Sequence, residues 1–308
     1  MQFLFWLENH TELGQRSLED VIGIFGHQLR ELGHKAVWDT SRREAMIPAN
    51  QGYNVIVEGF TPPVVSLLAE MHGKGARFLI LATEEPTPKG FNHGTQQEMV
   101  LRQKVFPEAA KYADGILHLV PGQHVSDWYG QFAPTAYCEL GYAKTLVRAF
   151  NDIVPDYEFG FYGSMSERRY KLLKKLANRT GKVKGVRIMS DFKTQRERDD
   201  AMKRAKVIVQ IRKFKEMGLV SSSRCNTALC LGRPVVAEPH LLSKPWDEIV
   251  KFTDSEEHFL NSCMLTLTAW KGVHAAQFER FKTRLSPELC AGAALEKLGI
   301  TQPQRLTA

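Results

Sequence analysis

The stretch "SSSRCNTALCLGRPVVAEPH" (221–240) gathers hydrogen-bond donors at the start of a predicted helix. Three serines and an arginine open the helix, Gly232 follows its expected end, and a short apolar strand comes next. One serine is enough to cap a helix, whereas a helix N-terminus with extra hydroxyl and guanidinium donors suits an anion. The pattern therefore favours an anion-binding site over a plain cap. The candidate ligands are Ser222, Ser223, Arg224 and Asn226.

A second turn with similar chemistry is "FYGSMSERR" (161–169), where the predicted strand 157–163 meets a helix. Arginines in the first turns of a helix oppose its dipole, so they lower stability unless an anion lies there. The turn has neither a G-x-G-x-x-G nor a Walker pattern. A capping serine beside surface arginines is the alternative interpretation. The candidate phosphate ligands of this turn are Ser164 and Arg168.

Glu238 ends the apolar strand of the first stretch. A carboxylate cannot hold a phosphate, but acidic residues at strand ends accept hydrogen bonds from ribose hydroxyls in nucleotide-binding sheets. We therefore expect Glu238 to bind the ribose or the sugar. The alternative is a surface glutamate that precedes Pro239.

The N-terminal half offers candidates for activating a hydroxyl group. The loop "LATEEPTPKGFNHG" (81–94) follows a predicted strand, and its carboxylates or imidazole could deprotonate an acceptor if the pKa were suitable. A loop ion pair or a capping histidine is the alternative for each residue. The candidate catalytic residues are Glu84, Glu85 and His93. The first strand-to-helix loop supplies three further candidates for an acceptor cleft, namely Asn9, His10 and Gly14.

Elements that could position these residues alternate along the whole chain. A strand at 3–8 is followed by an apolar periodicity that predicts a helix over 17–33, with Ser17 as its cap, and strands and helices continue in turn. The pattern restarts near residue 154. It is typical of parallel α/β units in two sets. We expect two doubly wound Rossmann-like domains, 1–152 and 153–308, facing a central cleft, with the last helix free to cross back.

Composition narrows the class of protein. The 308 residues carry a net charge of +7, and the segment 168–216 holds 18 Lys and Arg against 5 Asp and Glu. This segment indicates an anionic partner or a solvated helix face. No apolar run is long enough for a membrane helix, and the start lacks the features of a secretory signal. The five cysteines form no C-x-x-C pair and no metal-ligand spacing. We therefore expect a cytoplasmic protein, with peripheral membrane association left open, and no bound metal.

The segment "GLVSSSRCNTALCLGRPVVAE" (218–238) resembles the donor-binding segment of retaining GT-B glycosyltransferases. It is more similar still to the bacterial spore-maturation-protein-like (CgeB-like) glycosyltransferase group, in which a Ser-x-Arg stands eight residues before a glycine and a Glu follows the strand. Ser222, Arg224, Gly232, Pro234 and Glu238 match that spacing. The segment 157–176 resembles the opening of the same group's nucleotide-binding domain, and 112–123 resembles the last strand of an N-terminal GT-B domain.

This resemblance implies transfer of a sugar from a nucleotide-diphospho-sugar to a glycan, a lipid-linked or a small-molecule acceptor. It implies no cofactor and no metal, because cationic side chains and helix dipoles stabilise the departing diphosphate. One departure concerns the paired glutamates of the retaining pattern, since Leu219 and Thr227 stand at their places. A catalytically silent sugar-nucleotide-binding protein is therefore the alternative.

Two other classes are disfavoured by missing motifs. A nucleic-acid-binding protein lacks a recognisable RNA- or DNA-binding motif, so we expect no nucleic-acid partner. A nicotinamide-dependent oxidoreductase lacks G-x-G-x-x-G after the first strand of either half. The oligomeric state, the base, the sugar and the stereochemical outcome are left open by the sequence.

Overall fold

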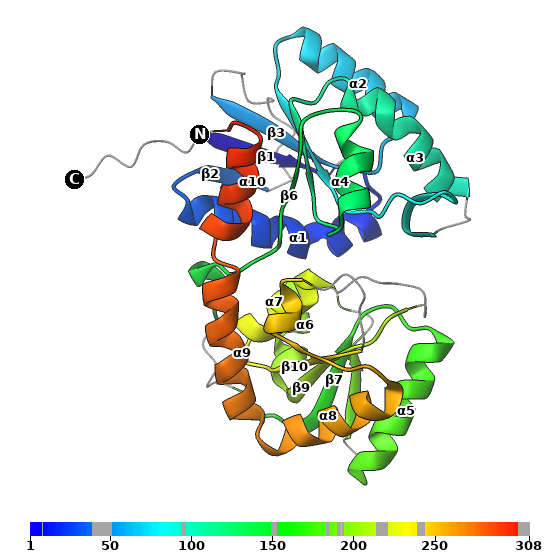
Figure 1. Cartoon of the computed structure of the whole chain (residues 1–308), viewed down its shortest axis with the longest axis vertical. Helices are drawn as coiled ribbons and strands as arrows, with labels where there is room; N and C mark the ends of the chain where they lie inside the picture. The colour runs from blue at the N-terminus through cyan, green and yellow to red at the C-terminus, as the bar shows by residue number, and fades with distance from the viewer. Residues whose placement is uncertain are drawn as a thin grey trace, which may run out of the picture. The chain divides into compact units, whose positions relative to one another are not determined.

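The computed structural model describes residues 1–7, 9–38, 51–93, 97–148, 153–182, 185–189, 192, 194–213, 221–238 and 244–300. The chain forms two compact units (Figure 1). Unit 1 consists of residues 1–143 and 287–308, and unit 2 consists of residues 144–286. Both units combine a parallel sheet with helices, so the predicted α/β class with two doubly wound sheets is confirmed.

Unit 1 is built on a six-stranded sheet in the order β2-β1-β3-β4-β5-β6, in which every pair is parallel. Its strands are β1 (Gln2–Trp6), β2 (Lys35–Val37), β3 (Gly52–Val57), β4 (Phe78–Ala82), β5 (Gly115–His118) and β6 (Thr135–Tyr137). Its helices are α1 (Glu12–Glu31), α2 (Pro62–Gly73), η1 (Phe91–His93), α3 (Gln97–Ala110), α4 (Gln123–Gly130), η4 (Glu288–Gly292) and α10 (Ala293–Lys297). The central strands β3, β4 and β5 are buried along their whole length, which their near-continuous apolar sequence requires.

Helix α1 begins earlier than its apolar periodicity predicts. The N-cap is Thr11, whose hydroxyl accepts a hydrogen bond from the main-chain N–H of Gly14 at 3.3 Å. The expected start at Ser17 is therefore wrong, because a polar first turn extends the helix beyond its apolar face. The expected end is confirmed, since Gly33 adopts a left-handed φ of 82° directly after the cap residue Leu32.

Unit 2 has a five-stranded parallel sheet in the order β11-β10-β9-β7-β8. Its strands are β7 (Tyr157–Tyr162), β8 (Val186–Met189), β9 (Ala205–Gln210), β10 (Val235–Ala237) and β11 (Lys251–Phe252). Its helices are η2 (Lys144–Leu146), α5 (Glu167–Thr180), α6 (Gln195–Lys203), α7 (Ser222–Cys230), η3 (Trp246–Glu248), α8 (Glu256–Thr268) and α9 (Trp270–Arg284). The helix predicted from the stretch at 221–240 is confirmed as α7, and Gly232 follows it with a φ of 77°.

Each sheet has one point at which the strand order reverses. In unit 1 the chain leaves β1 toward β2 and returns to the other side of β1 with β3. In unit 2 it leaves β7 toward β8 and returns to the other side of β7 with β9. The loops that follow these strand pairs diverge, and ligands of open α/β sheets bind at such points. The loops after β1 and β3, and those after β7 and β9, are therefore the places to look for a site.

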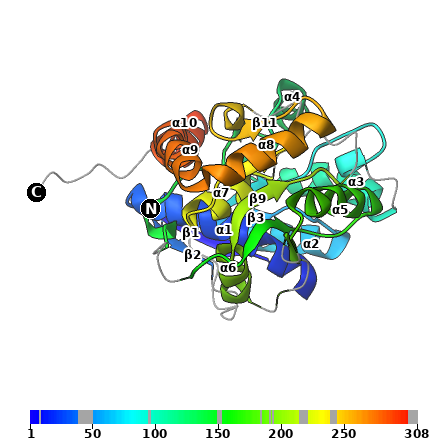
Figure 2. The same ribbon diagram turned by 90° about the horizontal axis from the view of Figure 1, so that it is seen from below.

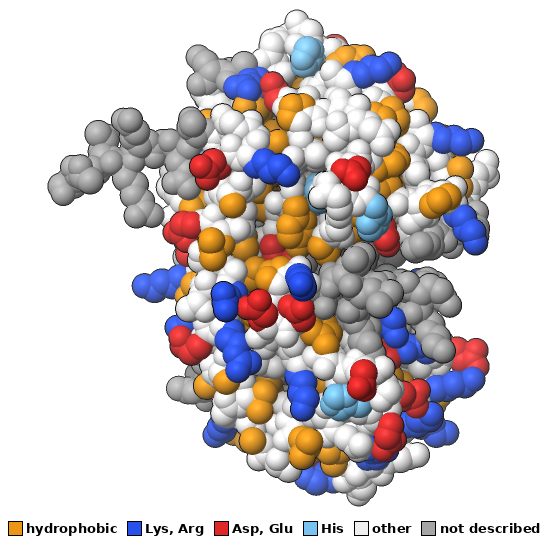
Figure 3. All heavy atoms as spheres, viewed as in Figure 1, with side chains coloured by type: hydrophobic (Ala, Val, Ile, Leu, Met, Phe, Trp, Pro, Cys, Tyr) orange, Lys and Arg blue, Asp and Glu red, His pale blue; other side chains and the backbone are white. Residues whose placement is uncertain are grey.

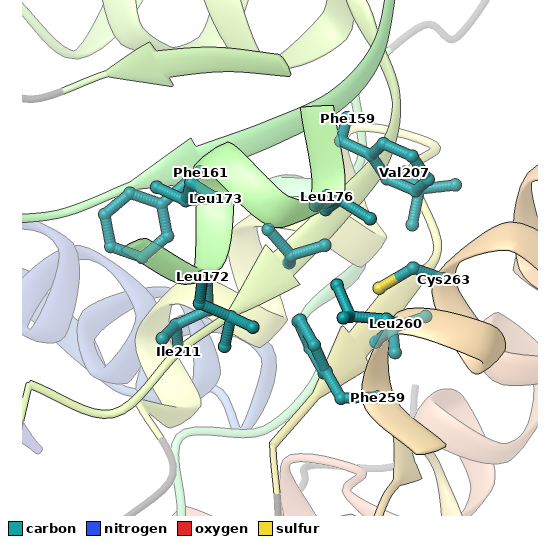
Figure 4. Close-up of a cluster of buried hydrophobic side chains, with 12 residues drawn as sticks. Phe159, Phe161, Leu172, Leu173, Leu176, Val207, Ile211, Phe259, Leu260 and Cys263 are labelled. Carbon is teal, nitrogen blue, oxygen red and sulfur yellow. The ribbon is translucent and has the colours of Figure 1, made fainter. Parts of the chain in front are cut away.

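The core of unit 2 holds the strands that carry its site. Side chains of α5 and α8 pack on the same face of β7 and β9, and the two helices lie side by side (Figure 2). Figure 4 shows this cluster, which includes Phe159, Phe161, Leu172, Leu176, Val207, Phe259, Leu260 and Cys263. Each of these side chains is at most 3% exposed. The cluster fixes α5 against the sheet, and with it the first turn of α5.

We expect Leu176→Ala to lower the free energy of unfolding by about 3 kcal/mol, because it removes a fully buried leucine from this cluster and leaves a cavity. Leu265→Ala, on α8 and 64% exposed, is the matched control and should change it by less than about 0.5 kcal/mol. Chemical denaturation followed by circular dichroism measures both. Equal effects of the two variants would contradict the assignment of Leu176 to the core.

Candidate active site

The loops after β7, β9 and β10 meet the first turns of α5 and α7 in unit 2. Arg168 and Arg169 come from α5, Arg224 from α7, and Glu238 from the end of β10. We call these four residues the guanidinium cluster. It lies at the reversal point between β7 and β9, and hydrogen bonds from both α5 arginines reach the loop after β9.

Arg168 and Glu238 form a two-pronged ion pair. Arg168 Nη1 donates to Glu238 Oε2 at 2.8 Å and to the main-chain oxygen of Arg212 at 2.8 Å, while Nη2 donates to Glu238 Oε1. Glu238 Oε2 also accepts a hydrogen bond from the Arg212 main-chain N–H at 2.7 Å. Glu238 is only 2% exposed. In this arrangement its carboxylate orients Arg168 and the loop after β9, instead of facing solvent as a ribose acceptor would.

Arg169 joins the two loops at the reversal point. Its Nε donates to the Ile211 main-chain oxygen at 2.9 Å, and its Nη1 donates to the main-chain oxygen of Ser164 at 2.7 Å. Burial and, next, the charge of Arg224 lower the pKa of Arg169 to about 10, with Glu238 opposing both effects. The positive charges of the cluster are thus crowded together. The sequence analysis did not select Arg169, although its place beside Arg168 in the first turn of α5 carried the same signal.

Arg224 lies against the turn after β7 because that turn begins with a glycine. A Cβ built on Gly163 would lie 2.8 Å from Arg224 Nη1, and Gly163 has a φ of 142°. The guanidinium group lies 5.6 Å from the ring centre of Tyr162, within range of a cation–π contact. The structure therefore brings Arg224 of α7 to the turn that carries the other two predicted residues, Ser164 and Arg168. The local reason is that Gly163 removes the side chain that would occupy the place of the guanidinium.

The remaining candidates on α7 have different surroundings. Ser222 begins the helix and is half-buried, as is Ser223, whose Oγ lies 3.5 Å from that of Ser221. Asn226 is 1% exposed, and its side-chain oxygen lies 3.5 Å from Cys230 Sγ within the helix. Asn226 thus lies below the first turn, where it packs with α7 itself. Thr227 donates its hydroxyl to the Ser223 main-chain oxygen, and Leu219 lies outside the described residues.

In unit 1, the candidates of the first loop join the two strands of its reversal point. Asn9 Nδ2 donates to the Val57 main-chain oxygen at 2.7 Å, and His10 Nε2 lies 3.3 Å from the same oxygen. Gly59, with a φ of 129°, leaves room for the ring, since a Cβ there would lie 2.5 Å from His10 Cε1. Burial lowers the pKa of His10. Gly14 lies in the first turn of α1, where its N–H completes the cap.

Glu84 and Glu85 follow β4, and their carboxylates point to different partners. Glu84 Oε1 accepts a hydrogen bond from Arg102 Nη1 at 3.1 Å, while its Oε2 is buried and has no partner among the described residues. Burial raises the pKa of Glu84, and Arg102 opposes part of this effect. Glu85 Oε1 lies 3.3 Å from His124 Nε2. The third catalytic candidate, His93, ends η1, but its side chain lies outside the described residues.

Two histidines and one carboxylate complete this edge of the sheet. His118 is buried in the core, and His124 lies in α4. Glu58, directly after β3, is 2% exposed and accepts a hydrogen bond from the Thr83 main-chain N–H at 2.7 Å. The sequence analysis missed Glu58. The available signal was an acidic residue between a buried strand and a glycine, as in "IVEGF" (56–60).

Part of the basic segment 168–216 pairs with acidic side chains of unit 2. Six of its lysines and arginines form ion pairs with Glu158, Glu167, Glu256, Glu257 and Asp156. In Figure 3, Lys and Arg side chains likewise lie beside Asp and Glu side chains over the drawn face. This agrees with the interpretation as a solvated helix face for these positions. Arg168, Arg169 and Arg224 differ, because they converge on one point.

Metal and membrane sites were searched for in the described part of the chain. Among those residues, no group of three or more His, Cys, Asp or Glu side chains could hold a metal ion. None of the described helices is both long and apolar enough to span a membrane.

Comparisons with solved structures identify the fold. An α-glucosyltransferase in complex with UDP and DNA is 9% identical, with a TM-score of 0.62 and coverage of 97% of this chain and 99% of that chain. HepE of Anabaena, in complex with UDP and glucose, is 10% identical, with a TM-score of 0.56 and coverage of 97% and 99%. BGT of T4 phage, in complex with UDP-glucose, is 9% identical, with a TM-score of 0.56 and coverage of 97% and 99%.

The chain therefore has the fold of GT-B glycosyltransferases. No protein-family model matches the sequence, and no curated protein matches it. These comparisons do not support the expectation that nucleic acid is no partner, because a neighbour of the same fold holds DNA. The predicted membership of the spore-maturation-protein-like group stays a prediction, as does a cytoplasmic location.

We expect Glu238→Gln to lower the free energy of unfolding by about 2 kcal/mol, because it weakens a buried, charge-assisted pair and leaves Arg168 without its counter-charge. Glu257→Gln is the matched control. Its carboxylate also pairs with an arginine, Arg179, but at the exposed surface between α5 and α8, where such pairs contribute about 0–1 kcal/mol. Urea denaturation compares the two, and a loss at Glu257 as large as that at Glu238 would contradict a special role for the buried pair.

Proposed function

We propose that the protein is a glycosyltransferase that binds a nucleotide-diphospho-sugar through unit 2 and transfers the sugar to a hydroxyl group. The guanidinium cluster, joined to the first turns of α5 and α7, is the observation on which this proposal rests. The fold supports it, since its neighbours include proteins in complex with UDP or UDP-glucose. We assign the diphosphate to Arg224, Ser222, Ser223 and the turn at Ser164.

The charges of the cluster fit a departing diphosphate. Among the described residues, three guanidinium groups lie close to one another at the first turns of two helices, beside the carboxylate of Glu238. The leaving group gains negative charge as the sugar bond breaks, so fixed cations that are already in place stabilise the transition state more than the ground state. We infer that these groups do the work that a bound metal ion does elsewhere, and that turnover persists in the presence of EDTA.

Within the cluster the arginines have different tasks. Arg168 and Arg169 are held by Glu238, Arg212 and the loop main chain, so they contribute charge and shape. Arg224 lies at the turn after β7, and we assign it direct contact with the diphosphate. Glu238 then acts on the donor through Arg168, in place of the ribose contact expected from the sequence. Leu219 and Thr227 stand where the retaining pattern has its paired glutamates, and the proposed donor site is rich in arginine instead.

On the acceptor side we propose Glu84 as the general base. Its Oε2 is buried and finds no partner in the part of the chain that the structure describes, and a buried unpaired acceptor lowers stability unless a ligand donates to it. Burial raises the pKa of Glu84 toward the range that suits proton transfer. Glu85 is engaged with His124. We take the acceptor to be a hydroxyl-bearing glycan, lipid-linked or small molecule, as the resemblance to GT-B glycosyltransferases implies.

Arg224→Ala should lower turnover of the donor by 10²-fold or more, equivalent to about 3 kcal/mol, by removing a partner of the leaving diphosphate. Arg179→Ala, which removes an exposed arginine of α5, is the control and should leave turnover within a factor of two. Release of nucleoside diphosphate from a panel of sugar nucleotides measures the rate. Normal turnover in Arg224→Ala would remove Arg224 from the site.

Gly163→Ala should weaken binding of a nucleoside diphosphate at least tenfold, because its Cβ would displace the Arg224 guanidinium. Gly181→Ala isolates the effect of backbone strain, since Gly181 has a φ of 61° and no atom within 4 Å of a built Cβ. Calorimetric titration with UDP measures the affinity. Binding by all variants without any turnover would instead support the catalytically silent alternative.

Transfer should rise with pH through the raised pKa of Glu84 and then level off, because only the carboxylate accepts the proton. Glu84→Gln should lower kcat by 10²-fold or more and remove this acidic limb. Glu108→Gln, an exposed carboxylate of α3 paired with Lys111, is the control and should keep both the rate and the profile. A pH profile unchanged in Glu84→Gln would exclude Glu84 as the base.

A further inference from the structure

A short chain of buried oxygen atoms connects β3, α4 and the segment after β4. Tyr129 Oη lies 2.9 Å from Glu58 Oε2 and 2.9 Å from the main-chain oxygen of Glu84. Tyr129 is 0% exposed and Glu58 is 2% exposed. The chain therefore ends on the main chain of the proposed base, in a place that solvent water reaches little.

The number of available protons limits how these three oxygen atoms can be hydrogen-bonded to one another. Both contacts have the length of O–H···O hydrogen bonds, and each needs one proton. The phenol of Tyr129 has a single proton, and the main-chain oxygen of Glu84 is an acceptor only. A protonated Glu58 would give each contact a proton of its own: the phenol then donates to the Glu84 oxygen, and Glu58 Oε2 donates to the phenol. A carboxylate at Glu58 would leave two acceptor oxygens competing for one proton.

The other oxygen of Glu58 is consistent with this arrangement. Oε1 accepts hydrogen bonds from the main-chain N–H of Thr83 at 2.7 Å and from its hydroxyl at 3.3 Å. Oε1 thus acts as the carbonyl oxygen and Oε2 as the hydroxyl of a carboxylic acid. Every contact of Glu58 is then a satisfied hydrogen bond, which a fully buried polar group requires.

The charges around Glu58 also favour its neutral form. Among the described residues no cation forms an ion pair with it, because Arg102 pairs with Glu84 and Glu98 instead. Burial and, next, the charge of Glu84 raise the pKa of Glu58 well above its usual value, while its hydrogen bonds oppose this in part. The titratable and charged groups on the elements that pack against this place are His10, Glu84, Glu85, Glu98, Arg102, His118, His124 and Tyr129.

We propose that Glu58 is a neutral carboxylic acid at physiological pH and that Glu58 and Tyr129 are positioning residues for Glu84. They hold the main chain of Glu84 so that Oε1 accepts a hydrogen bond from Arg102 and Oε2 keeps no partner among the described residues. Neutral Glu58 also lets Glu84 carry the negative charge, because two neighbouring buried carboxylates do not both ionise. The positioning role rests on the proposed function, whereas the protonation state of Glu58 does not.

The protonation state is tested without any activity. Infrared difference spectra of the full chain, wild type against Glu58→Gln, should contain the carbonyl band of a protonated carboxylic acid at pH 7. Glu84→Gln, with a different carboxyl group removed, is the matched control and should not remove that band. A difference spectrum that contains only carboxylate bands would overturn the proposal.

The pH dependence of stability gives an independent measurement. A folded-state pKa above the unfolded value makes the contribution of Glu58 complete at pH below about 4.5, and it is lost as pH rises through the folded-state pKa. The folding equilibrium constant of the wild type should therefore fall relative to that of Glu58→Gln by up to about tenfold per pH unit in this window. A ratio that stays constant from pH 5 to pH 8 would contradict a neutral Glu58.

The positioning role is tested by kinetics. Tyr129→Phe should lower kcat at least tenfold and shift the acidic limb of the pH profile, with donor affinity in unit 2 unchanged. Tyr137→Phe is the matched control, since Tyr137 also donates to a glutamate of unit 1, Glu139, but away from Glu84. Glu58→Gln, which keeps one donor and one acceptor, should recover most of the activity that Glu58→Leu loses.

The two kinds of result separate the two proposals. Wild-type protein that binds no sugar nucleotide would overturn the proposed function, while the infrared band would still decide the state of Glu58. Equal kcat for Tyr129→Phe and wild type, in an active enzyme with an unchanged pH profile, would overturn the positioning role alone.

Discussion

Positive charge held at the ends of parallel strands is the constraint on which the site of unit 2 depends. Arg169 bonds to the loop after β7 and to the loop after β9, and Arg168 is fixed by Glu238 from the end of β10. Burial and, next, the charge of Arg224 lower the pKa of Arg169, so part of this shift reflects repulsion between neighbouring guanidinium groups. The fold supports this crowding with one buried carboxylate and with main-chain oxygens. An anionic ligand would reduce the repulsion that remains among the guanidinium groups, so ligand binding would also stabilise the fold.

The reversal points of the two sheets share one local device. A glycine follows one strand of each reversal pair, separated from β3 by one residue at Gly59 and directly after β7 at Gly163, and a polar side chain from another segment lies where its Cβ would be. In unit 1 that side chain is His10, and in unit 2 it is Arg224. Strand ends at a reversal point offer diverging loops and open main-chain groups. The glycine allows a distant side chain to approach the strand end closely. That side chain is an imidazole in unit 1 and a guanidinium in unit 2.

The sequence predicted the helices and strands better than it predicted which side chains contact one another. Alternating strands and helices indicated the α/β class, and the serine-rich helix start was located correctly because caps and glycines are local signals. The pairing of Glu238 with Arg168, 70 positions away, could not be predicted, since the order of strands in a parallel sheet is not written in any local pattern. The surroundings of Asn226 could not be predicted either, because this polar side chain is buried and its oxygen lies 3.5 Å from Cys230 Sγ of the same helix. Glu58 was overlooked because a single acidic residue after a strand resembles many surface positions.

A crystal structure of the protein with a bound nucleoside diphosphate tests the central claim most directly. The account predicts diphosphate oxygens within hydrogen-bond distance of the Arg224 guanidinium and of the first main-chain N–H groups of α7, with the Arg168–Glu238 pair intact beneath them. A diphosphate bound elsewhere, with Arg224 making no contact to it, would contradict the account.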